Sequence, residues 1–234
     1  MKAVLWIKID FRIFDNECIH SALKDCGEVL PFFCWESKII NGGDYSKFHL
    51  QAQWQALEEL RSNVENRGGF LRVVSGDIVN EMEVLFQEYS FTHLYSHMET
   101  GNLISYERDR EVAKWCKNRG VFWSEISQSS VVRGHSAEGR RRKSKQGDLR
   151  KSSPIPAPKV IVSPSQKSLR IENLEWKSLC SLFSKFSGCA LLPSIQPVSE
   201  KRAWSTLGSF IEKRGVNYSG GISSPNTAFV HGSR

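Results

Sequence analysis

The sequence predicts an α/β fold in which a five-stranded doubly wound parallel sheet carries helices on both faces. Short apolar runs and amphipathic helical segments alternate along the first 126 residues, and five such runs are present. The apolar runs are nearly continuous, as in strands that are buried on both faces. Cap residues and glycines stand where the helical segments begin and end. Strands and helices that alternate in this way form a parallel sheet with crossover helices.

The first four elements follow from apolar spacing and from capping residues. Lys2–Lys8 is a short apolar run suited to a buried strand. Asn16 is expected to cap a helix that runs to Cys26, because an asparagine side chain accepts hydrogen bonds from the first helical turn. Val29–Trp35 is the second predicted strand, although Pro31 weakens its start. Phe48–Arg67 carries apolar residues at helical spacing and ends at a pair of glycines, as helices commonly do.

The next five elements repeat the same alternation. We predict a third strand over Phe70–Val74, a third helix over Ile78–Tyr89 and a fourth strand over His93–Ser96. A fourth helix over Ser105–Arg119 is closed by Gly120, and Val121–Ile126 is the fifth strand. Ligands bind to such sheets at the carboxyl ends of the strands. The candidate rim therefore comprises the loops after Lys8, Trp35, Val74 and Ser96.

Composition excludes several classes of protein. The chain has 234 residues, of which 40% are apolar and 24% charged, so it can bury a sizeable core. No apolar run is long enough to cross a bilayer, and the first ten residues do not form a signal or transit peptide. The six cysteines are scattered without a CxxC pair, which argues against a zinc knuckle and a disulfide framework. We expect a soluble, cytoplasmic protein that acts as a monomer.

The positive charge is concentrated in one segment. The net charge is +7, and twelve basic residues stand against four acidic ones between Arg133 and Lys177. The same segment is rich in serine, proline and glycine, which favours a solvated linker. The alternative is a contact with a nucleic-acid backbone, although no aromatic residue interleaves with these charges. After the linker we predict helices over Glu172–Phe186 and Ser199–Arg214, followed by a loop to the end.

Several motifs resemble those of the photolyase and cryptochrome family. The opening segment Trp6–Asn16 is similar to the W-F-R-R-D-L-R-L-x-D-N opening of that family. Met98–Asn102, together with Tyr106–Asp109 and Val112, resembles the family's E-x-G…RD-x-x-V segment. Further matches are Trp123, Glu125, Gln128, Val131–Arg133, Ala203–Arg214, Tyr218, Pro225 and Gly232–Arg234. The motifs occur in the family's order along essentially the whole chain.

Two positions depart from the family pattern. The family's connector usually continues with Arg-x-Gly-Trp, where this sequence has Glu138–Arg142. The chain also stops at Arg234, one residue before the Leu-Ser-Pro of the family's phosphate loop. The resemblance implies an antenna-type α/β domain over 1–130, a basic interdomain linker over 131–170 and the start of a flavin-binding helical domain over 171–234. We therefore expect a fragment that is catalytically incomplete.

The resemblance implies light-dependent repair of cyclobutane pyrimidine dimers in DNA by reduced flavin adenine dinucleotide (FAD). Such a protein is a DNA lyase whose DNA partner contains pyrimidine dimers, and an antenna folate or deazaflavin can assist it. One alternative is a cryptochrome-like blue-light photoreceptor. Another is a module without catalysis that binds an antenna chromophore or a partner protein. None of the residues present is expected to act as a catalytic acid or base.

The candidate site residues fall into two groups. By resemblance, Tyr218, Gly232, Ser233 and Arg234 belong to the flavin site, where a hydroxyl and backbone N–H groups suit phosphate oxygens. Glu99, Gly101 and Asn102 lie on the rim and are antenna-chromophore candidates, with a structural role as the alternative. Arg108 and Asp109 are expected to form an ion pair with the first loop, and Asp10 and Arg12 to pair with neighbouring loops. No metal site is predicted at His93 and His97.

Overall fold

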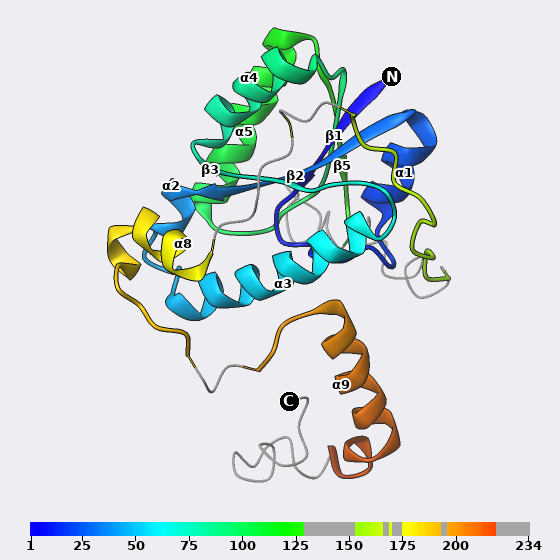
Figure 1. Ribbon diagram of the computed structural model, residues 1–234, viewed down its shortest axis with the longest axis vertical. Coiled ribbons are helices and arrows are strands. Elements are labelled where there is room, and N and C mark those ends of the chain that lie inside the picture. The colour runs from blue at the N-terminus through cyan, green and yellow to red at the C-terminus, as the bar shows by residue number, and fades with distance from the viewer. Residues whose placement is uncertain (129–152, 166–168, 170–174, 193–195, 219–234) are drawn as a thin grey trace, which may run out of the picture.

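The computed structural model describes residues 1–128, 153–165, 169, 175–192 and 196–218. Five parallel strands form one sheet in the order β3-β2-β1-β4-β5 (Figure 1). This order confirms the predicted doubly wound topology. The strands are β1 (Lys2–Ile7), β2 (Glu28–Glu36), β3 (Arg72–Gly76), β4 (His93–His97) and β5 (Phe122–Ile126).

Helices cover both faces of the sheet, as the alternating pattern predicts (Figure 1). The helices up to β5 are α1 (Glu17–Asp25), α2 (Ser37–Ile40), α3 (Lys47–Glu65), α4 (Ile78–Tyr89) and α5 (Leu103–Arg119). Helices α1 and α3 bury their apolar residues on one face, and α4 and α5 bury theirs on the other. Alternate residues of β1 serve the two faces: Leu5 and Ile7 belong to one core, and Val4 and Trp6 to the other.

Capping residues mark the starts of the helices. Asn16 Oδ1 accepts a hydrogen bond from Ile19 N at 3.1 Å, as predicted for the first helix. Asp77 caps α4 and Asn102 caps α5 in the same manner. Pro31 lies inside β2, but β3 pairs with β2 only from Phe32 onward, so the sheet loses no ladder bond on that side at Pro31.

Part of the predicted linker packs against the α/β domain. Ile161 is 2% exposed, and its backbone N–H donates to Arg67 O at 2.8 Å. Val162 O accepts a hydrogen bond from Val29 N at 2.8 Å. Residues 153–165 therefore lie on the domain, which differs from the expectation of a solvated linker, because apolar side chains alternate with the serines and prolines here. The basic residues of 131–152 lie outside the described residues.

Beyond the linker the described residues form two helical segments. The first consists of α8 (Trp176–Leu182) and a 3₁₀ turn, η2 (Ser184–Phe186). Its residues Leu179 and Phe183 join the core that contains α3. The prediction of one helix over Glu172–Phe186 was thus too long, since Phe183 takes extended backbone angles and interrupts it. The second segment is α9 (Glu200–Glu212), followed by η3 (Arg214–Asn217).

Helix α9 is tied to the domain by polar contacts. The Glu200 carboxylate accepts hydrogen bonds from Ile13 N and Phe14 N, both at 3.1 Å. The Glu59 carboxylate on α3 accepts one from Lys201 N at 3.2 Å. Trp204 packs edge-on against Phe14. Among the described helices, none combines the length and apolarity needed to cross a membrane.

Candidate functional site

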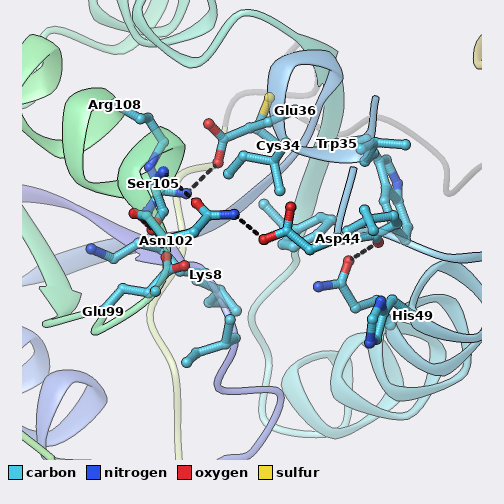
Figure 2. Close-up of a pocket in the computed structure, with 18 of the residues that line it drawn as sticks. Lys8, Cys34, Trp35, Glu36, Asp44, His49, Glu99, Asn102, Ser105 and Arg108 are labelled. Atoms are coloured by element: carbon cyan, nitrogen blue, oxygen red, sulfur yellow. Dashed lines mark hydrogen bonds and ion pairs between the residues drawn. The ribbon is translucent and has the colours of Figure 1, made fainter. Parts of the chain in front are cut away.

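A pocket of about 480 Å³ opens at the carboxyl ends of β1 and β2 (Figure 2). Its walls come from these two strand ends, from the start of α3, and from the segment between β4 and α5. The chain leaves β1 toward β2 on one side, and β4 pairs with β1 on the other. The pocket therefore lies where the strand order reverses, which is the usual ligand site of a doubly wound sheet. Its volume is within the range of small-molecule sites.

One half of the pocket is apolar and aromatic. Phe33 and Trp35 on β2 contact each other edge-on, with ring centroids 4.9 Å apart. Trp35 is 1% exposed, and its Nε1 has no hydrogen-bond acceptor within the described part of the chain. A buried donor without an acceptor costs free energy. An acceptor atom on a bound ring is one way to satisfy it. The remaining residues of this half are Ile7, Ile39, Ile40, Tyr45, His49, Ala52 and Gln53.

The other half is charged and is organised by Arg108. Its guanidinium donates to Glu36 at 2.8 Å, to Glu99 at 2.5 Å and to Asp109 at 2.9 Å. The arginine side chain is 5% exposed, so these interactions are only weakly screened by water. Lys8, at the end of β1, contacts Asp109 at 3.3 Å and Glu125 at 3.4 Å. Arg108 and Lys8 both lie over the Trp6 ring. The charged half is therefore a connected network.

Burial changes the pKa of two groups in this network. Burial raises the pKa of Glu36 to about 7, although the positive charge of Arg108 opposes the change. Burial lowers the pKa of Lys8, and Asp109 partly offsets this effect. Both shifts have the sign expected when a charged group leaves water. The charge of the pocket consequently changes near neutral pH through Glu36.

The pocket mouth is bridged by one hydrogen bond. Asn102 Nδ2 donates to Asp44 Oδ2 at 2.6 Å, which joins the start of α5 to the loop between α2 and α3 (Figure 2). Lys185, on η2, donates to Gly42 O at 2.9 Å and also to Tyr45 O, so it holds the same loop from the other side. The loop that carries Asp44 and Tyr45 is thereby fixed over the pocket.

The backbone at Gly101 packs so closely against neighbouring side chains that any larger residue would clash with them. A methyl group at this position would lie 2.8 Å from Glu99 Oε1 and still closer to Ser105 Oγ. Both of those residues line the pocket. The backbone at Gly101 therefore approaches the charged half as closely as a glycine allows.

The structure brings together the three rim candidates but not the flavin candidates. Glu99, Gly101 and Asn102 all line the pocket. Tyr218 follows η3 and packs edge-on against Phe210. It is not among the residues that line the pocket. Gly232, Ser233 and Arg234 lie outside the described residues.

Of the ion pairs expected from the sequence, those of Asp109 and Asp10 are present. Arg108 pairs with Glu36 and Glu99 rather than with the first loop, and Arg12 donates to Asp15 O and Gln128 Oε1, neither of which is charged. Asp109 pairs with Lys8 at the start of the first loop, as predicted. Asp10 accepts contacts from His97 at 2.8 Å and from Gln128, and these lower the pKa of Asp10 despite its burial. His97 is thus a partnered histidine. Within the described residues, no group of three or more histidine, cysteine or acidic side chains is placed to hold a metal ion.

Sequence reasoning missed part of the pocket wall. Trp35 and Glu36 end the second strand, whose following loop belonged to the predicted rim, but neither residue was singled out. Asp44, Tyr45 and His49 come from the loop after α2 and from the first turn of α3. A short helix of four residues has no detectable periodicity, so α2 was not predicted either.

The fold and the pocket define a doubly wound α/β domain with a pocket of small-molecule size at its switch point. The chain belongs to the DNA photolyase family, whose model matches residues 3–146.

Two curated relatives illustrate the range of this family. Over 105 residues the chain is 33% identical to the blue-light photoreceptor PHR2 of Arabidopsis thaliana, an alignment that covers 43% of this chain and 24% of the relative. Over 178 residues it is 23% identical to a deoxyribodipyrimidine photo-lyase of Synechococcus sp., covering 71% of this chain and 36% of the relative.

Solved structures share the fold. A bacterial class III photolyase from Agrobacterium tumefaciens superimposes with a TM-score of 0.71 at 19% identity, covering 94% of this chain and 46% of that one. A cryptochrome from Synechocystis sp. PCC6803 gives a TM-score of 0.68 at 14% identity, and the superposition covers 94% of this chain and 48% of the cryptochrome. The chain thus spans less than half the length of these relatives.

Proposed function

We propose that this chain is the α/β part of a light-dependent flavoprotein, and that its pocket binds an antenna chromophore of the folate or deazaflavin class. The observation that carries the proposal is the pocket at the switch point, lined by Glu99, Gly101 and Asn102. Family membership supports the proposal, because the relatives include both photo-lyases and blue-light photoreceptors.

The residues of the pocket fit a fused heteroaromatic ring. Phe33, Trp35 and Tyr45 provide flat apolar surface against which such a ring can pack. The absence of a side chain at Gly101 lets the ring edge approach Glu99. A bound antenna chromophore supplies absorption of near-ultraviolet or blue light, and the protein supplies position and a dry environment.

Retention of a chromophore tests this proposal. The purified chain is incubated separately with a reduced folate and with a deazaflavin, desalted, and examined by absorption spectroscopy. We expect a retained near-ultraviolet or blue band. The Ala52→Trp variant, which fills the pocket, should lose the band, and Ser62→Trp on the exposed far end of α3 should keep it. A colourless wild-type protein under both conditions contradicts the proposal.

For the flavin we propose a separate site. Tyr218, Gly232, Ser233 and Arg234 belong to it by resemblance, and the domain limits of 1–130, 131–170 and 171–234 follow from the same resemblance. Ser233 and Arg234 would donate hydrogen bonds to the phosphates of FAD. Flavin absorbance retained after desalting in the presence of FAD, and lost in the Arg234→Ala variant, supports this assignment. Flavin that is retained equally by that variant contradicts it.

For the whole protein we propose light-dependent repair of pyrimidine dimers in DNA, with a blue-light photoreceptor as the alternative. Relatives of both kinds are present, so the family does not favour either. Illumination of the reduced, flavin-loaded protein with a dimer-containing oligonucleotide separates the two functions. Loss of the dimer supports repair, and photoreduction of the flavin with an intact dimer supports the photoreceptor.

We also propose that the protein is cytoplasmic and monomeric. Several relatives have names that place them in organelles, among them a chloroplastic/mitochondrial cryptochrome DASH of Arabidopsis thaliana. Imaging of a tagged protein expressed from its complete reading frame tests the location, and sedimentation tests the assembly.

A further inference from the structure

The charges around the pocket are predominantly negative, and this bears on which chromophores it accepts. The inference rests on the proposed function, because it concerns the ligand of the same pocket. Two cations, Lys8 and Arg108, line the pocket. They stand against Glu36, Asp44 and Glu99 in the lining and against Asp109 and Glu125 directly behind it. A third cation, Lys185, lies near Asp44 at the mouth, and Glu36 is fully ionised only above its pKa of about 7. Among the described residues, five acidic groups thus face three cations.

Both cations are already engaged with carboxylates. The side chains of Lys8 and Arg108 are 1% and 5% exposed, and each contacts at least two acidic groups within 3.4 Å. Turning Arg108 toward a ligand phosphate would break its ion pairs with the buried Glu36 and Glu99 carboxylates, and turning Lys8 would remove one of the two cations that hold Asp109. Breaking buried ion pairs in this way is unfavourable. Neither side chain is therefore available to neutralise a phosphate.

The helix ends at the pocket are engaged as well. A helix N-terminus is the common alternative site for a phosphate group. At the start of α5, however, Asn102 Oδ1 already accepts the hydrogen bond of Ser105 N at 3.1 Å. At the start of α3, Ser46 and His49 form a reciprocal cap. Asp44 then adds a negative charge at the mouth, and the hydrogen bond from Asn102 lowers the pKa of that carboxyl.

We infer that the pocket selects a chromophore whose enclosed part is an uncharged ring with a hydrogen-bond donor edge, and that it rejects chromophores that bring a phosphate group into it. Glu36 and Glu99 accept hydrogen bonds from ring N–H or amino groups. The archaeal photolyase from Sulfolobus tokodaii is described with two FAD molecules. We expect a diphosphate of that kind to be disfavoured in this pocket, because Asp44 and Glu99 in its lining would repel the negative charge.

Riboflavin and flavin mononucleotide form a matched pair of probes, since they share ring and ribityl chain and differ by one phosphate. Their dissociation constants are measured by flavin fluorescence at low and at high ionic strength. At low ionic strength we expect riboflavin to bind about tenfold more tightly than flavin mononucleotide, because nearby carboxylates repel the phosphate group. The difference should shrink as salt screens the exposed charges.

Variants locate the source of the discrimination. Asp44→Asn removes one exposed charge while its amide oxygen still accepts the hydrogen bond from Asn102, and it should reduce the preference for riboflavin about threefold. Glu65→Gln also removes one negative charge, but at the far end of α3, about 24 Å along the helix from His49 at the pocket. This variant should leave the preference for riboflavin unchanged.

Each outcome decides the inference. Equal or tighter binding of flavin mononucleotide overturns the selection against phosphate and leaves the proposed function in place. A preference that does not respond to Asp44→Asn or to salt also overturns it, because the origin is then not electrostatic. If neither flavin binds, the inference fails, and the separate desalting experiment decides whether the proposed function fails with it.

Discussion

Lys8 Nζ lies 3.3 Å from the Asp109 carboxylate, and this contact joins the end of β1 to α5 behind the pocket. Both side chains are almost entirely buried, at 1% and 5% exposure. Asp109 also holds Arg108, which in turn holds Glu36 and Glu99. The charged half of the pocket therefore depends on one carboxylate that does not itself line it.

Removal of that carboxylate should destabilise the fold. We expect Asp109→Asn to lower the free energy of unfolding by about 3 kcal/mol, because Lys8 then remains buried with a weaker partner. The double variant Lys8→Met/Asp109→Leu should recover most of the loss, since it removes both charges. Urea denaturation of the two variants measures the effect. A single variant as stable as the wild type contradicts the assigned role of the pair.

The cap of α1 should contribute a measurable part of the stability. Asn16 accepts a hydrogen bond from Ile19 N and donates one to Arg12 O at 2.9 Å. We expect Asn16→Ala to cost about 1–2 kcal/mol, and Asn16→Asp, which retains the acceptor for Ile19 N, to cost less. Thermal unfolding followed by circular dichroism measures both. Equal losses for the two variants would show that the cap contact contributes little.

Gly101 should be required for binding more than for folding. In Gly101→Ala the added methyl group meets Glu99 and Ser105, so those side chains must move into the pocket or the backbone must shift. We expect chromophore affinity to fall about tenfold or more. A tenfold fall corresponds to a loss of about 1.4 kcal/mol in binding free energy. Gly27→Ala is the matched control, because no heavy atom lies within 4 Å of its added carbon. Isothermal titration with the retained chromophore compares the variants, and unchanged affinity in Gly101→Ala refutes the prediction.

Glu36 should make stability depend on pH. Its pKa is about 7 in the folded chain, and its reference value is 4.5. Between these values the unfolded chain has released the proton that the folded chain retains, so the free energy of unfolding falls as pH rises from about 4.5 to 7. The contribution is on the order of 2–3 kcal/mol. Urea denaturation of Glu36→Gln and of the wild type across this pH range isolates the contribution of Glu36. If the free energy of unfolding depends on pH in the same way for both proteins, Glu36 does not make this contribution.

The sheet was predictable because its information is local. Each strand is an apolar run bounded by a glycine, a cap residue or a turn, and the alternation with helices predicts a parallel sheet, although not the order of its strands. The segment 153–165 was not predictable in the same way. Its prolines and serines indicate a linker, whereas Ile161 is buried against the segment between α3 and β3 by contacts that the local pattern does not encode.

The pocket was predictable in part. Glu99, Gly101 and Asn102 were found through the family resemblance and through their place after a strand. Trp35 and Glu36 lie at a strand end that the topology marks, but an apolar run gives no sign that its last residues face a cavity. Asp44 and His49 reach the pocket only because α3 packs across the sheet, and tertiary packing of this kind has no sequence period.

The most direct test of the central claim is an NMR measurement on the indole N–H of Trp35. The chain has seven tryptophans, and the Trp35→Phe variant assigns the resonance by its disappearance. On addition of a reduced folate or a deazaflavin, we expect the resonance of the Trp35 indole proton to shift, because Trp35 lines the pocket and a bound aromatic ring changes its surroundings. A Trp35 resonance that stays unchanged at saturating concentrations of both compounds would contradict the assignment of this pocket as the chromophore site.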